Sequence, residues 1–169
     1  MVRDLIVIDI EITREEDAYE IFETTNARGI DLSVGDLLKN LIFSRIRPKD
    51  DKDFAKEVWQ EITSNIETTN TELKKFVKYF WISRRKHVTE KKLYREIKNK
   101  TSDWQTLLDN LWTDSTWYSL LLEGSEDDFP DIRGKDKIFD SVFALRLMGV
   151  TQCYVLLLSI LRNHKKLGT

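Results

Sequence analysis

The polar residues best suited to chemistry surround one glycine turn near the start of the 169-residue chain. Gly29 can adopt the positive φ that ends a helix, and Asn26 and Arg28 precede it. Lys39 and Asn40 follow on the helix that the turn feeds. A guanidinium beside a helix N-terminus suits an anion, so one interpretation is that Arg28 and Lys39 face a phosphate. The other is that Asn26 and Arg28 hydrogen-bond the turn itself while Lys39 is solvated.

Two carboxylates, Glu23 and Asp36, lie on either side of the same turn. The spacing does not bring them to one pocket, so no catalytic residue is predicted and an independent enzyme is the weakest hypothesis. The two histidines, His87 and His164, are isolated in the sequence and lack the spacing of metal ligands. The sequence therefore predicts no metal site.

Residues 22–40 resemble a segment of the GmrSD-type restriction family, in which it closes a ParB-like nuclease and nucleotide-hydrolysis domain. The similarity is ungapped and keeps both residue type and spacing. Residues 89–98 and 152–158 are more loosely similar to the helical middle region of that family. The matching positions are Phe22, Glu23, Asn26, Arg28, Gly29, Leu32, Ser33, Asp36, Leu37, Lys39 and Asn40.

This resemblance implies a non-catalytic helical part of a modification-dependent, type IV-like DNA restriction endonuclease that acts in phage defence. Residues 1–46 would end the ParB-like domain, and residues 47–169 would form the helical region. The family's Asp-Gly-Gln-Gln-Arg motif and its downstream HNH-type region do not occur in the sequence. We therefore expect a segment between two active regions, either excised or from a truncated gene, with the missing nuclease domains or subunit as partners. Full-length relatives use a nucleoside triphosphate and a divalent metal, whereas this segment is expected to need no cofactor.

Charge is strongly segregated along the chain, although the formal net charge is only −2. Residues 74–100 carry 11 Lys and Arg against 2 acidic residues (+9), whereas residues 101–140 carry 3 against 10 (−7). A cationic helix–loop–helix predicts contact with DNA phosphates. Two alternatives stay open: a solvated helix face, or pairing with the acidic block inside the molecule. The DNA-binding candidates are Lys74, Lys75, Lys78, Arg84, Arg85, Lys86, Lys91, Lys92, Arg95 and Lys98.

Composition predicts a globular protein in the cytoplasm. The chain is 41% hydrophobic and 33% charged, without a bias toward disorder, and it is poor in Gly and Pro, which disfavours sandwiches and barrels. The most apolar run, residues 150–161, is too short to span a membrane and contains Thr151 and Gln152. The single Cys153 excludes an internal disulfide, fits a reducing compartment and is expected to be a small core residue.

The elements predicted to position these residues give a mainly α fold. Alternating polarity at residues 5–12 predicts a short half-buried strand, which another chain, as in a homodimer, or a neighbouring helix would complete. Capping signals at Thr13 and Ser33 predict a helix-turn-helix pair around the glycine turn. Apolar stripes at helical spacing then predict a multi-helix bundle, with helices beginning near residues 54, 73, 89, 104, 135 and 150.

The five Trp residues mostly fall on these apolar stripes and are predicted to lie in the core. Trp117 lies off the cleanest stripe and is the best candidate for base stacking. The alternative to a DNA-holding role is a helical protein–protein interaction module with no contact to nucleic acid. In that case the basic face would dock the acidic face of the same chain or of a partner.

Overall fold

The computed structural model describes residues 34–46, 53–130 and 134–163. The chain divides into two compact units, Met1–Leu32 and Ser33–Thr169, and every described residue belongs to the second. These residues form seven α-helices and one 3₁₀ turn, without a strand among them, which confirms the predicted mainly α fold. The predicted strand at 5–12, the helix from Thr13 and the glycine turn lie outside the described residues.

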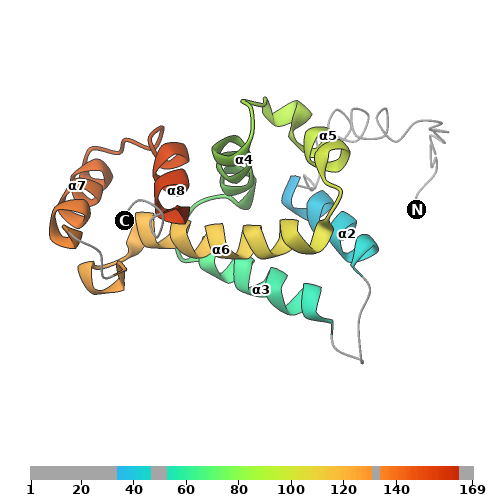
Figure 1. Cartoon of the computed structure of the whole chain (residues 1–169), viewed down its shortest axis with the longest axis horizontal. Helices are drawn as coiled ribbons and strands as arrows, with labels where there is room; N and C mark the ends of the chain where they lie inside the picture. Colours follow the sequence, from blue (N-terminus) through green and yellow to red (C-terminus); the bar gives the residue numbers. More distant parts are fainter. Residues whose placement is uncertain (1–33, 47–52, 131–133, 164–169) are drawn as a thin grey trace, which may run out of the picture. The chain divides into compact units, whose positions relative to one another are not determined.

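The helices of this unit are labelled in Figure 1. Their bounds are α2 Val34–Arg45, α3 Phe54–Glu67, α4 Leu73–Arg84, α5 Glu90–Lys100, α6 Trp104–Glu123, η2 Glu126–Asp128, α7 Lys135–Leu147 and α8 Tyr154–Arg162.

Helix α6 is the longest element of this unit and organises its packing. α3 packs along it, and α8, α4 and α2 also contact it. α4 packs against α8 as well, and α2 packs against α3, α4 and α5. Aspartate side chains cap the N-termini of two helices. Asp53 accepts a hydrogen bond from the Lys56 amide at 3.2 Å, and Asp103 accepts one from the Thr106 amide at 3.0 Å.

The apolar stripes of the sequence form one continuous core. On α4 the buried side chains are Phe76, Val77, Phe80 and Trp81, at the predicted helical spacing. α5 buries Leu93 and Ile97, whereas Thr89 occupies its N-cap position without a capping hydrogen bond from its side chain. The helix predicted to begin near residue 89 is therefore confirmed.

Helix α2 belongs structurally to this same helical unit. It buries Val34, Leu38 and Ile42 in the common core. The compact unit therefore begins near residue 33, before the predicted domain boundary between residues 46 and 47. The predicted boundary marks where the ParB-like family domain would end, which need not coincide with the start of a compact unit. It therefore stays a prediction.

Three details differ from the sequence-based expectation. Phe54 and Trp112 lie on predicted stripes but are 49% and 43% exposed. The last helix begins at Tyr154 rather than near residue 150, because Gly149 turns the chain with a φ of 65° and the next residues form a turn. Cys153 is thus the half-buried N-cap of α8, and its Sγ donates to the Val150 carbonyl at 3.3 Å. Within the described ranges, no helix has the length and apolar character to cross a bilayer.

Candidate nucleic-acid interface

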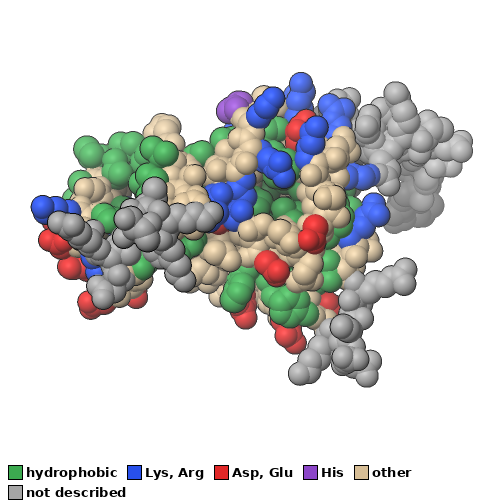
Figure 2. All heavy atoms as spheres, viewed as in Figure 1, with side chains coloured by type: hydrophobic (Ala, Val, Ile, Leu, Met, Phe, Trp, Pro, Cys, Tyr) green, Lys and Arg blue, Asp and Glu red, His purple; other side chains and the backbone are tan. Residues whose placement is uncertain are grey.

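All ten predicted DNA-binding cations lie on α4, on the linker at residues 85–89 or on α5. Figure 2 shows blue side chains gathered where Figure 1 labels these two helices, with some red among them. Six of the ten are exposed, and we call these six the cationic face. They are Lys75, Arg85, Lys86, Lys91, Lys92 and Arg95.

Local folding explains why these residues point outward. Leu93 and Ile97 are buried on one side of α5, so Lys91, Lys92 and Arg95 occupy exposed positions between and around them. The linker is anchored by the buried side chain of Val88. Burial of Val88 keeps the connection between the two helices against the core, while Arg85, Lys86 and His87 are exposed.

Glu90 partly neutralises the α4 side of this surface. Its carboxylate forms ion pairs with the ammonium groups of Lys74 at 2.9 Å and of Lys78 at 3.2 Å. These pairs link the start of α5 to α4. These hydrogen bonds, first to Lys74 and then to Lys78, lower the pKa of Glu90, so the pairs persist below the ordinary titration range of a glutamate. The Glu90 carboxylate therefore offsets part of the positive charge that Lys74 and Lys78 carry.

Two members of the cationic face lie over aromatic rings. The Lys75 ammonium lies 5.9 Å from the centre of the Tyr79 ring, and the Arg85 guanidinium lies 5.9 Å from that of Trp81. Trp81 itself is buried beneath its neighbours. This aromatic support restricts the two cations to the surface without removing them from solvent.

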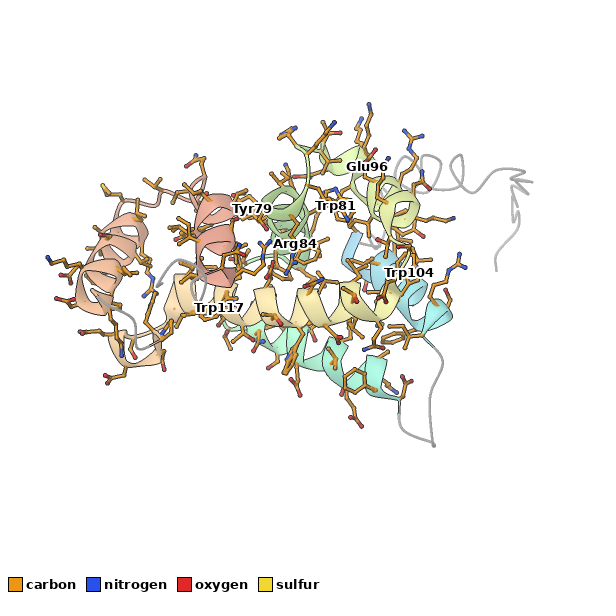
Figure 3. All side chains as sticks on the ribbon, in the orientation of Figure 1. Tyr79, Trp81, Arg84, Glu96, Trp104 and Trp117 are labelled. Carbon is orange, nitrogen blue, oxygen red and sulfur yellow. The ribbon has the colours of Figure 1, made fainter. Side chains whose placement is uncertain are left out.

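Arg84 is directed away from the cationic face, into the bundle (Figure 3). Its Nε donates to Oδ2 of Asp114 at 3.1 Å and its Nη2 donates to Oδ1 at 2.9 Å. Asp114 is fully buried on α6. A buried carboxylate needs such a partner, so Arg84 has a structural role that the other candidates do not share.

Arg162, at the end of α8, was not among the predicted site residues. Its Nε donates to the same Asp114 Oδ1 at 3.3 Å, and its Nη2 donates to the Ser83 hydroxyl at 2.8 Å. A signal for Asp114 exists in the sequence, because it falls on the buried stripe of α6 with Leu111 and Tyr118. A charged residue at a core position predicts a charged partner, but does not say which one.

The remaining candidates are placed as follows. Lys98 on α5 is half-buried, and so are Asp36 and Lys39 on α2, whereas Asn40 is exposed. Glu23, Asn26, Arg28 and Gly29 lie outside the described residues, so the glycine-turn hypothesis stays a prediction. The described part of the chain contains no cluster of His, Cys, Asp and Glu that could hold a metal ion.

One carboxylate of the acidic block reaches the basic stretch in the described structure. Asp114 forms an ion pair with Arg84. Asp103 and Asp128 instead accept hydrogen bonds at helix starts, and Asp109 accepts from Gln105. Intramolecular pairing with the acidic block thus accounts for the inward position of Arg84.

The tryptophans do not form a stacking platform beside the cationic face. Trp117, the candidate for base stacking, is half-buried and packs against the core. Trp112 is the exposed tryptophan of α6, and it lies five residues earlier. From the sequence spacing, Trp112 is expected in the core and Trp117 at the surface, and the structure shows the reverse. The two are hard to distinguish because both fall near the edge of the same stripe.

A cavity of about 430 Å³ lies near the carboxyl end of α4. It is bounded by α4, by the connection at residues 100–103, by the first turns of α6 and by the end of α8. Four cations line it, namely Arg84, Arg85, Lys100 and Arg162, against the single acid Asp103. Its polar character and its size are compatible with a small anionic ligand.

No family model matches the chain, and neither does a curated protein or a solved structure. The resemblance of residues 22–40, 89–98 and 152–158 to the GmrSD-type family therefore stays a prediction. The site must be interpreted from its own geometry.

Proposed function

We propose that the helical unit binds DNA through its phosphate backbone, using the cationic face of α4, the 85–89 linker and α5. The observation that carries this proposal is the exposure of all six cations on two consecutive helices and their linker. The fold supplies the spacing between the charges, and the core beneath α4 and α5 keeps both helices in place. Such a surface recognises charge rather than base sequence.

Binding of this kind depends steeply on salt, because each neutralised phosphate releases a condensed counterion. With all six cations engaged, the slope of log K against log salt would be about −5, from roughly −0.9 per contact. A shallower slope would indicate that fewer than six phosphate contacts form, and its value would give their number. The slope is therefore a more specific measurement than the affinity at one salt concentration.

In the wider context, we propose a non-catalytic helical region of a modification-dependent restriction endonuclease. It would couple a nucleotide-sensing region to a nuclease and hold DNA between them. The support is the resemblance of residues 22–40 together with the cationic face. On this proposal the purified chain neither cleaves plasmid DNA nor hydrolyses nucleoside triphosphates, and metal-dependent cleavage lost in Glu23→Ala or Asp36→Ala would contradict it.

The decisive test compares two double variants with the same change in charge. Lys91→Glu with Lys92→Glu alters exposed residues of the cationic face, and Lys56→Glu with Lys137→Glu alters exposed residues of α3 and α7. A fluorescent duplex is titrated with each protein at two salt concentrations. We expect the first variant to flatten the salt slope by about 2 and the second to leave it nearly unchanged.

Arg84 is unsuitable for this test, because a glutamate there would face the buried Asp114 carboxylate. Glu90→Gln is the better companion, since it releases Lys74 and Lys78 from their ion pairs and should strengthen duplex binding. If the wild-type chain shows no salt-dependent binding, or if both double variants weaken it equally, the proposal fails.

One observation favours the alternative function, a protein–protein interaction module. α7 and α8 expose several large apolar side chains, which are Phe143, Leu147, Met148, Leu156 and Ile160. Under that alternative the duplex titration shows no binding even at low salt, and the same charge reversals on α5 remove a protein partner instead.

A further inference from the structure

The cavity beside α4 contains a charge arrangement that the proposed function does not use. Asp114 is the shared acceptor of two guanidinium groups, those of Arg84 and Arg162. Two positive charges thus meet one negative charge inside the bundle, which leaves a net charge of +1. Exposed Lys100 and Arg85 add two cations along the cavity wall, against Asp103.

Both guanidinium groups retain donors that the protein does not use. Arg84 commits Nε and Nη2 to Asp114, and Arg162 commits Nε to Asp114 and Nη2 to Ser83. A guanidinium has five N–H donors, so Nη1 of each remains without a partner among the described residues. Both side chains line the cavity, and each is about one fifth exposed.

The surroundings increase the tendency of this cluster to take an anion. Burial lowers the pKa of Arg162, and the nearby Arg84 charge lowers it further, while Asp114 opposes both. A second negative charge beside the two guanidinium groups would neutralise the remaining net positive charge. The wall also offers hydroxyl and amide groups, those of Thr101, Ser102 and Asn110.

We infer that this cavity binds a phosphate monoester, with its phosphate held by Arg84 and Arg162 and with Lys100 as a third cation. A monoester carries a charge of about −1.5 to −2 near neutral pH, which suits this cluster better than the single charge of a backbone phosphodiester. The cavity also has room for more than the phosphate. The site goes beyond the proposed function, because Arg84, Lys100 and Arg162 do not belong to the cationic face and only the wall residue Arg85 is shared with it.

The same chemistry has two sources, a free mononucleotide and the phosphorylated end of a nucleic-acid strand. The experiment uses the full chain and isothermal titration with AMP in a buffer without phosphate. We expect saturable binding that inorganic phosphate competes away and adenosine does not. Tighter binding of a 5′-phosphorylated trinucleotide than of AMP, with no binding of its 5′-hydroxyl form, would identify a strand end, and the reverse order a free nucleotide.

Three variants test the residues. Lys100→Gln and Arg162→Gln should each weaken AMP binding about tenfold, the usual effect of losing one charge-assisted hydrogen bond. Asp114→Asn should strengthen it several-fold, because it removes the carboxylate that competes for both guanidiniums. A purely structural role of the cluster would not produce this opposite sign. Circular dichroism checks that each variant is folded, and Lys100→Gln alters an exposed side chain, so it keeps the test valid if the other two fail to fold.

Lys91→Gln with Lys92→Gln is the matched control, because it removes exposed charge from α5 outside the cavity. It should weaken duplex binding and leave AMP binding unchanged, which separates this inference from the proposed function. The inference is overturned if AMP does not saturate the chain in the millimolar range, if adenosine competes as well as phosphate, or if Lys100→Gln binds AMP like the wild type.

Discussion

The α4–α5 pair and helix α7 are held in the protein by different forces. α4 and α5 bury their apolar side chains, among them Phe80, Leu93 and Ile97, and leave charge at the surface. α7 buries only Val142 among its described side chains, and it exposes Leu147 at 74%. Similar helical patterns in the sequence thus lead to a well-covered pair in one region and to a thinly covered helix in the other.

Hydrogen bonds from one arginine contribute to the attachment of α7. Arg146 donates from Nε to the Leu121 carbonyl at 2.7 Å, from Nη1 to the Gly124 carbonyl at 2.7 Å and from Nη2 to the Leu120 carbonyl at 2.6 Å. One guanidinium therefore satisfies carbonyls at the C-terminal end of α6. An edge-on contact between Phe129 and Phe139 adds apolar area nearby. α7 is therefore attached by one cationic side chain together with a small apolar contact area.

The largest effect is expected from Leu93→Ala in α5. Leu93 is fully buried, so removal of its side chain should lower the free energy of unfolding by about 3 kcal/mol. Urea denaturation followed by circular dichroism measures this, and the loss should appear as a shift of the whole transition. A loss below about 1 kcal/mol would mean that α5 is not part of the cooperative core.

A smaller and more local effect is expected from Arg146→Gln. The variant removes most of the hydrogen bonds to the end of α6 and should cost about 1–3 kcal/mol. Hydrogen exchange should show faster exchange of α7 amides, while those of α4 and α5 keep their protection. Uniform loss of protection across all helices would show that α7 is as integral to the fold as α5.

Tyr118 of α6 lies between α4 and α8, with its ring against Phe76 of α4 and Tyr154 of α8. Burial raises its pKa to about 12, while a hydrogen bond with Thr71 opposes the shift. Because the pKa is higher in the folded state, this contribution to stability is complete below the unfolded pKa, near 10, and is lost as pH rises toward 12. Between pH 10 and pH 12, the free energy of unfolding should fall less steeply for Tyr118→Phe than for the wild type. The expected difference in slope is about 1.4 kcal/mol per pH unit. Equal alkaline slopes for the variant and the wild type would contradict this.

The smallest effect on stability is expected from Leu147→Glu with Met148→Glu. Both side chains are exposed, at 74% and 66%, so the free energy of unfolding should change by no more than about 0.5 kcal/mol. If α7 docks another protein, these substitutions should abolish that association while duplex binding persists. Analytical ultracentrifugation of the chain with and without the substitutions measures self-association directly.

The helices could be predicted from sequence because helical spacing determines which side chains share a face. That argument succeeded for Phe76 and Phe80, and it was wrong for Phe54 and Trp112. Spacing defines a face, but it does not say how far a neighbouring helix extends over that face. Phe54 is the first residue of α3, and Trp112 lies at the edge of the α6 stripe, where coverage ends.

The candidate site could be predicted only in part, for a similar reason. The charge run located the cationic face, but composition did not distinguish Arg84, which turns inward, from Arg85, which stays outside. Arg84 turns inward because it pairs with a buried acceptor, Asp114. This residue lies 30 positions further along the chain, so the charge run does not reveal the pair. Arg162 was missed because its role depends entirely on the packing of α8 against α4 and α6.

The shared carboxylate has a consequence for the order of events during synthesis. Arg84 is made 30 residues before Asp114, whereas Arg162 is made 48 residues after it. At about 5–20 residues per second, the ribosome needs about 2–10 seconds to add the second guanidinium. During that interval the nascent α6 has one of its two cationic partners, and the junction of α4, α6 and α8 closes only when the later one has emerged. A translational pause between residues 114 and 162 would prolong this half-neutralised stage.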